Sequence, residues 1–230
     1  MKTMVIAGGL LASALLLTGC GLASIGGPNN QDTVSYQVTD KVTKLQLKSN
    51  AGDAVVTETD GNAIRVVETL HWRGDEKPTP QHKVEGGALF VTYDCASSWG
   101  SCGVDYKIEI PKGLPVDLDS GSGDITLRSL TGPIDAHVGS GDLGATGLAG
   151  KKVFVEAGSG NIQLQYTAVP ESAELKVGSG DIALNVPDGA YDVKTEVGSG
   201  DVAVSVKTDK SSPNKISLTS GSGDIAVLPG

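Results

Sequence analysis

Apolar and polar residues alternate in short runs from about residue 34 to the end of the chain, and Gly, Pro, Asn and Asp separate these runs. A period of two is typical of strands with one buried face, whereas a helix needs apolar residues three and four positions apart. No stretch of ten or more residues has convincing helical periodicity. The pattern therefore predicts an all-β domain. Examples in the first half are Val34–Val38, Leu45–Leu47, Ala54–Val56, Ile64–Val67, Leu89–Val91 and Tyr106–Ile110.

A four-residue motif, Gly-Ser-Gly-Asp or its Asn variant, occurs six times in the second half of the chain. Successive copies are 18, 19, 20, 20 and 23 residues apart, and Asn50–Asp53 is a degenerate earlier copy. A period near twenty predicts a stacked repeat fold, in which each unit covers the apolar face of its neighbour. The last motif residues are Asp124, Asp142, Asn161, Asp181, Asp201 and Asp224.

Each repeat predicts two short strands joined by the motif. Counted from the last motif residue, apolar residues favour positions −8, −6 and −4 on one side and +1, +3 and +5 on the other. Gly tolerates positive φ, and Asp or Asn can hydrogen-bond its own backbone, so the motif is suited to a turn. The second turn of each repeat varies, as in Thr131–Pro133 and Pro187–Gly189. We predict a solenoid-like stack of short strands, of the β-helix or β-roll type; an antiparallel meander with the motif closing hairpins is the alternative.

The N-terminus predicts export. Met4–Leu17 is an uncharged, mostly apolar run that is shorter than the about 20 residues of a membrane-spanning helix, so it is typical of a signal peptide. Leu17-Thr18-Gly19-Cys20 follows, and it resembles the lipobox of bacterial lipoproteins. That resemblance implies cleavage before Cys20 and attachment of lipid, including acyl chains such as palmitate, to Cys20. Several acyl chains on one residue would anchor the protein stably. An ordinary secretory signal with an incidental Cys is the alternative.

Composition divides the rest of the chain into two parts. Residues 20–32 are rich in Gly, Ser, Asn and Pro without periodicity, which predicts a flexible tether after a signal peptide of residues 1–19. Residues 33–230 can form one all-β domain. Loss of Lys2 with the signal peptide changes the formal net charge from −9 to −10. This charge argues against binding to nucleic acid or anionic lipid headgroups, so membrane attachment would depend on the lipid anchor.

Two further cysteines, Cys95 and Cys102, are close together in the sequence. In an exported protein an even remainder predicts a disulfide. Free thiols and a metal pair are the alternatives, although the sequence has no His or second Cys pair nearby for a metal.

Three sequence features together resemble the bacterial adhesin-like domain family DUF4097. They are the segment Leu45–Val56, the segment Ile108–Leu118 with its Ile-Pro-Lys-Gly, and the run of Ser-Gly-Asp-Ile copies. The resemblance covers roughly residues 34–228. It implies a β-rich surface or envelope protein and says little about chemistry, because fold analogy is a weak argument for function.

The sequence predicts no catalytic residues. A nucleophile elbow needs Gly-x-Ser-x-Gly between a strand and a helix, and the six motif serines do not fit it. The three histidines, His71, His82 and His137, are scattered and suggest neither a metal site nor a triad. The motif serines are Ser122, Ser140, Ser159, Ser179, Ser199 and Ser222.

The row of motif carboxylates is the sharpest chemical hypothesis. Stacked coils would place them about 5 Å apart, and Ca²⁺ would relieve their repulsion. Alternatively, each Asp caps its own turn and is solvated. We therefore predict no cofactor, with calcium at the motif residues as the alternative.

These observations predict a lipoprotein on the extracytoplasmic face of the cell membrane, with a non-catalytic, adhesin-like or wall-associated binding domain. Its expected ligand is a cell-wall glycan. The alternative is an accessory or sensor protein that recognises a membrane or envelope protein in envelope-stress signalling.

Overall fold

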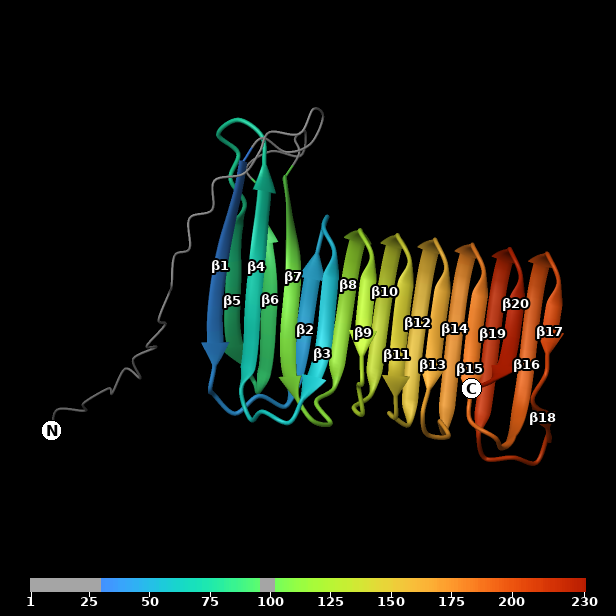
Figure 1. Ribbon diagram of the computed structural model, residues 1–230. Coiled ribbons are helices and arrows are strands. Elements are labelled where there is room, and N and C mark those ends of the chain that lie inside the picture. Colours follow the sequence, from blue (N-terminus) through green and yellow to red (C-terminus); the bar gives the residue numbers. More distant parts are fainter. Residues whose placement is uncertain (1–29, 96–101) are drawn as a thin grey trace, which may run out of the picture.

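The computed structural model describes residues 30–95 and 102–230, which form twenty strands and no helix. The strands lie in two ten-stranded sheets, sheet I and sheet II, packed face to face (Figure 1). In spatial order, sheet I contains β1 (Asn30–Val38), β4 (Ile64–Trp72), β7 (Cys102–Pro111), β3 (Ala54–Thr59), β9 (Ile125–Arg128), β11 (Leu143–Leu148), β13 (Ile162–Tyr166), β15 (Ile182–Val186), β20 (Ile225–Pro229) and β17 (Val202–Val204). Sheet II contains β18 (Lys207–Thr208), β16 (Ala190–Ser199), β19 (Lys215–Ser222), β14 (Ser172–Ser179), β12 (Lys152–Ser159), β10 (Ile134–Ser140), β8 (Val116–Ser122), β2 (Lys44–Ser49), β6 (Ala88–Asp94) and β5 (Thr79–Glu85).

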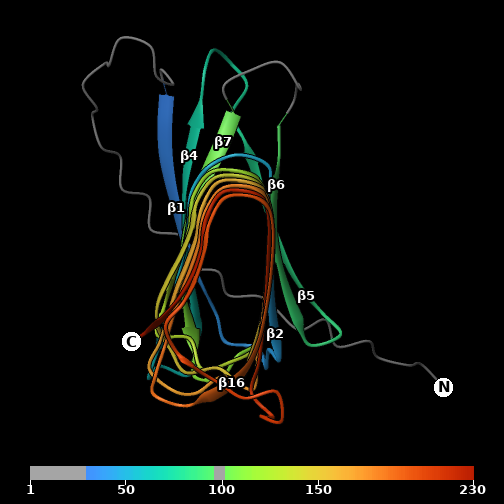
Figure 2. The same ribbon diagram turned by 90° about the vertical axis from the view of Figure 1, so that its right-hand side faces the viewer.

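The chain winds as a flattened solenoid, with one strand in each sheet per coil. Strands of neighbouring coils pair in parallel and in register; for example, Ser140 of β10 lies beside Ser122 of β8 and Ser159 of β12. Seen along the stack, the coils superimpose as a narrow oval (Figure 2). The solenoid prediction is confirmed, and the meander alternative is excluded because a meander would pair these strands antiparallel.

The order of the coils in space differs from their order in the sequence at both ends. The last coil in the sequence, β19 and β20, lies between the β14–β15 coil and the β16–β17 coil. Likewise, the β2–β3 coil lies between the β6–β7 coil and the β8–β9 coil. The spacing of 23 residues before the last motif accommodates the loop that returns the chain for this insertion.

The core lies between the two sheets and is built from the residues at the predicted offsets. In the β12–β13 coil, Val153, Val155 and Ala157 point inward from sheet II, and Ile162 and Leu164 point inward from sheet I. Burial of each large aliphatic side chain stabilises the fold by about 1.5–3 kcal/mol. The buried cluster is continuous from β1 to β20, so residues 30–230 contain the whole of the described hydrophobic core.

Antiparallel strands cover the N-terminal end of the stack. β1 pairs with β4, β4 pairs with β7, and β5 pairs with β6. Composition predicts a flexible tether that includes residues 30–32, and this boundary is wrong because these residues pair with Leu70–Trp72 of β4. The cross-strand partner, which composition does not encode, gives these polar residues their extended structure.

The described residues include no helix that could cross a membrane. The predicted signal peptide, the lipobox with Cys20 and residues 20–29 of the predicted tether lie outside the described residues. The loop of residues 96–101 also lies outside them.

Candidate functional site: the motif edge

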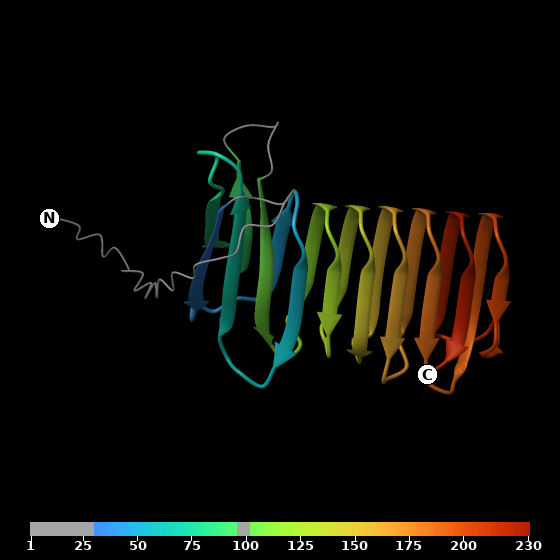
Figure 3. The same cartoon turned by 45° about the horizontal axis from the view of Figure 1, so that its top comes forward.

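The motif copies form one straight edge of the solenoid, which we call the motif edge: Asp53, Asp124, Asp142, Asn161, Asp181, Asp224 and Asp201 in spatial order. The first two motif residues end a strand of sheet II, and the last two lead into a strand of sheet I. Figures 1 and 3 show these connections aligned along one side of the stack, whereas the connections on the opposite side differ in length.

Each acidic or amide side chain of the motif edge holds the next coil. The Oδ1 atom of Asp124 accepts a hydrogen bond from the backbone N–H of Asp142 at 2.9 Å, and Asp142 accepts one from Asn161 at 2.7 Å. The same bond joins every pair of neighbouring motif residues and extends to Asp105 of β7, which accepts from Asp53. The prediction that each Asp caps its own turn is therefore wrong. Coils stack closely enough for the carboxylate to reach the adjacent turn instead.

The glycines of the motif are required by the same close approach. Gly160 has φ +115°, and a Cβ atom added to it would lie 2.1 Å from the carbonyl oxygen of Gly141 in the adjacent coil. In all the remaining copies, a Cβ added to the equivalent glycine would lie 2.0–2.3 Å from a backbone oxygen. Backbone atoms of a stacked coil cannot move aside cheaply, so a side chain is excluded at this glycine of each motif copy. Close stacking of the coils therefore explains why this glycine is the same in every copy of the motif.

The electrostatics of the motif edge are set by a row of exposed carboxylates with Asn161 among them. One oxygen of each internal carboxylate accepts an amide N–H, which partly offsets the repulsion between neighbours. Within the described ranges, no three His, Cys, Asp or Glu residues are grouped closely enough to hold a metal ion. Calcium at the motif residues stays a prediction.

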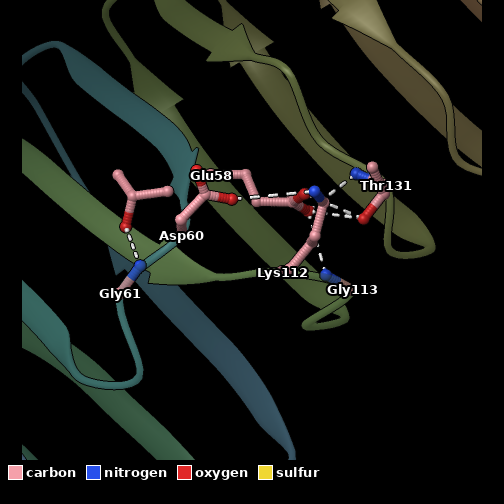
Figure 4. Close-up of polar contacts among 7 residues, drawn as sticks. Glu58, Asp60, Gly61, Lys112, Gly113 and Thr131 are labelled. Atoms are coloured by element: carbon pink, nitrogen blue, oxygen red, sulfur yellow. Dashed lines mark hydrogen bonds and ion pairs between the residues drawn. The ribbon is translucent and has the colours of Figure 1, made fainter.

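Glu58 organises the opposite edge of the stack near its N-terminal end. Its carboxylate accepts hydrogen bonds from the backbone N–H of Gly113 at 3.0 Å, and from the N–H and hydroxyl of Thr131 at 2.8 and 2.9 Å (Figure 4). Lys112 lies 3.7 Å from Asp60 beside this cluster. Glu58 therefore joins three neighbouring coils, those of β7, β3 and β9, and uses its polar atoms for stacking.

The predicted disulfide between Cys95 and Cys102 is confirmed, and it joins the end of β6 to the start of β7. The three histidines lie apart, as expected. His71 contacts Asp105 at 2.8 Å, His82 stacks on Tyr36, and His137 lies near Asp135 and Phe154. No described contact joins a motif serine to a histidine.

Glu68 is a buried acid that the sequence analysis missed. It is fully buried in β4, where Oε1 accepts a hydrogen bond from the Tyr36 hydroxyl at 3.0 Å and Oε2 has no partner within the described residues. Burial raises the pKa of Glu68 to about 7, and the Tyr36 bond partly opposes the shift. The alternation Ile64, Val66, Glu68 and Leu70 contained the signal, because it places Glu68 at an inward position.

A family model described as Toastrack DUF4097 matches residues 37–228. The chain belongs to this family. The match confirms the resemblance seen in the Ile-Pro-Lys-Gly segment and the motif copies.

Solved structures with similarity to this Toastrack domain include the "putative cell adhesion protein" of Clostridium sporogenes ATCC 15579. It is 15% identical with a TM-score of 0.52, and the alignment covers 87% of this chain and 100% of that one. A "putative adhesin" of Bacteroides fragilis NCTC 9343 is 15% identical with a TM-score of 0.47, covering 86% and 97%. At 15% identity, the first of these supports the fold alone. No curated protein matches the Toastrack chain.

Proposed function

We propose that this protein is an exported, lipid-anchored envelope protein whose Toastrack domain acts by binding a cell-wall glycan and not by catalysis. Three observations support export and anchoring: the lipobox sequence ending at Cys20, the Cys95–Cys102 disulfide and the signal-peptide run before them. The structural similarity to a protein described as a "putative cell adhesion protein" agrees with a binding role.

The most repeated polar residues of the chain serve the fold. Motif carboxylates bond to the adjacent coil, and Glu58 bonds to two neighbouring turns. The same motif position forms a bond between neighbouring coils in each copy, and such a repeated structural role is poorly suited to catalysis at a single site. This use of the motif favours a regular surface, and hence binding, as the basis of function.

We assign the binding surface to the outer face of sheet II. The main support for this assignment is the position of two aromatic residues, Phe90 and Phe154. Phe90 and Phe154 are the only phenylalanines of the chain, and both lie on this face. Lys83 lies over Phe90 and Lys176 lies over Phe154, each at 5.3 Å from the ring centre. Aromatic residues on a surface, with charged groups around them, are typical anchors for a ligand.

Polar side chains fill the row between the two rings. The in-register pairs of β6, β2, β8, β10 and β12 place Gln46, Asp117 and Asp135 between Phe90 and Phe154. At about 4.8 Å per strand, the rings are about 19 Å apart. Amide and carboxylate oxygens accept hydrogen bonds from hydroxyl groups, which a glycan presents at regular intervals. An in-register row of aromatic and polar side chains therefore fits an extended glycan.

The test is a binding isotherm of residues 30–230 on purified, insoluble cell-wall material, with and without millimolar Ca²⁺. We expect saturable binding that falls at least tenfold in the Phe90→Ala, Phe154→Ala double variant, because two aromatic anchors are removed. Leu228→Ala is the matched control, since this partly buried side chain lies on the outer face of sheet I. It should leave binding unchanged.

Each other outcome has a distinct meaning. Calcium-dependent binding that the double variant retains would move the site to the motif edge. Absence of binding in both conditions would reject a wall ligand and favour the accessory or sensor role, which crosslinking to a single envelope protein would then test.

A further inference from the structure

The C-terminal end of the stack presents two open strand edges. β17 is the last strand of sheet I and pairs only with β20. In sheet II, the outer side of β16 is covered by β18 at Ala190 and Tyr191 alone. The stretch from Asp192 to Ser199 therefore has β19 on one side and, among residues 30–95 and 102–230, no strand on the other.

The direction of the backbone groups along β16 follows from two hydrogen bonds. The Asp192 N–H donates to Asn214, toward β19, whereas the Tyr191 carbonyl accepts from Asp209 on the outer side. Backbone groups alternate along a strand, so those of Val193, Thr195 and Val197 point to the open side. Their side chains point toward the core row of Ile216, Leu218 and Ser220.

Apolar surface accompanies the open backbone. Only four large apolar side chains are exposed in residues 30–95 and 102–230, and two of them, Val202 at 42% and Val204 at 37%, are on β17. Val193 and Val197 are only partly buried, although the equivalent residues of internal coils are buried. A hollow of about 640 Å³ runs beside Asp192–Thr195 and Lys210. At the C-terminal end of the stack, the core-facing valines therefore lack the neighbouring coil that would bury them.

We propose that a second copy of this chain completes the end, with the two β16 strands paired antiparallel across a two-fold axis through Thr195. This axis pairs Val193 with Val197 of the second copy, and Thr195 with its own equivalent. All three belong to the set whose backbone groups face outward, so both strands can exchange hydrogen bonds. On the outer surface, Lys194 lies opposite Glu196 of the second copy, twice by symmetry.

Charge selects this register. Moving the axis by one residue in either direction keeps the backbone bonds but places Lys194 opposite Lys194, or Glu196 opposite Glu196. Both side chains are exposed and have no hydrogen bond or ion pair within the described part of the chain. Of these three registers, only the axis through Thr195 places opposite charges across from each other.

The same axis closes the assembly. It brings β17 against its own copy, so that Val202 and Val204 become buried with the β16 valines. A two-fold interface uses the same surface on both partners and leaves no open strand edge at this end of the stack, which protects this end from edge-to-edge aggregation.

The test is sedimentation equilibrium of residues 30–230 over a concentration series, for the wild type and the Lys194→Glu and Glu196→Lys variants. We expect a monomer–dimer equilibrium for the wild type. Each single reversal should weaken association about tenfold, because two attractive cross-strand pairs become repulsive. Lys107→Glu is the matched control, since Lys107 is an exposed strand lysine on β7 with no ion pair in the described structure. It should leave association unchanged.

Mixing the two single variants gives the decisive comparison. A mixed pair again faces Glu with Lys at both positions, so the mixture should form dimers at wild-type concentrations, as should the Lys194→Glu, Glu196→Lys double variant. A wild type that stays monomeric up to its solubility limit would overturn the proposal. The proposal would also be overturned if the single charge reversals left the association constant unchanged, or if mixing the two variants failed to restore dimers.

Discussion

Replacement of Gly160 by alanine tests the physical reason for the repeated motif. The residue has φ +115°, a conformation that costs a non-glycine residue about 1–3 kcal/mol. The added Cβ would also lie 2.1 Å from the Gly141 carbonyl oxygen. Relief of such a contact requires a backbone shift in the adjacent coil, which costs about another 1–3 kcal/mol. We therefore expect Gly160→Ala to lower the free energy of unfolding by about 2–6 kcal/mol, the sum of the two costs.

The matched control is Gly144→Ala, on the outer face of β11, where an added Cβ would meet nothing within 4 Å. Its free energy of unfolding should stay within about 1 kcal/mol of the wild type. Urea denaturation of residues 30–230, followed by far-ultraviolet circular dichroism, measures both values. Equal stability of the two variants would refute the argument, because it would mean that the coils do not approach closely at the motif.

Three further predictions use the same denaturation assay. Glu68 has a raised pKa, so its contribution to stability is fully present below about pH 4.5 and is lost as the pH rises through 7. The free energy of unfolding of the wild type should therefore fall by about 3 kcal/mol across this window. Glu68→Gln should remove most of this dependence of stability on pH. A variant with the wild-type slope would contradict this assignment. Asp142→Ala leaves the Asn161 N–H without its acceptor and should lower the free energy of unfolding by about 1 kcal/mol. The control, Asp40→Ala, changes an exposed residue with no described partner and should cost less than about 0.5 kcal/mol. Equal losses in the two variants would count against the motif-edge hydrogen bonds. Glu58→Ala removes three hydrogen bonds between coils and should cost about 2–3 kcal/mol, and a loss no larger than that of Asp40→Ala would show that this cluster does not stabilise the stack.

The alternating pattern was sufficient to predict the strands, their inward faces and the stacking of the motif. Val153 and Ile162, for instance, are buried because they occupy the predicted offsets on either side of Asn161. The disulfide was predictable because Cys95 and Cys102 are the only cysteines of the predicted domain. In each case the signal is local in the sequence.

The order of the coils was not predictable, because the motif copies are nearly identical. The strand ending at Ser179 can stack on one ending at Ser199 or Ser222 with the same turn geometry, and the chain uses Ser222. The bond from each Asp to the adjacent coil was also missed, since it depends on the distance between coils. The pairing of residues 30–32 with β4 depends on a partner about forty residues away.

The stacking of the motif turns, with the last coil inserted, is the claim on which the fold, the motif edge and the open β16 edge all depend. Intramolecular disulfide formation in two double-cysteine variants of residues 30–230 tests it most directly. Ser179 and Ser222 are in-register neighbours, about 4.8 Å apart, so Ser179→Cys with Ser222→Cys should form a disulfide under mild oxidation. Ser179 and Ser199 are two coils apart, at about 10 Å, so Ser179→Cys with Ser199→Cys should not. A disulfide in the second variant and none in the first would contradict the account.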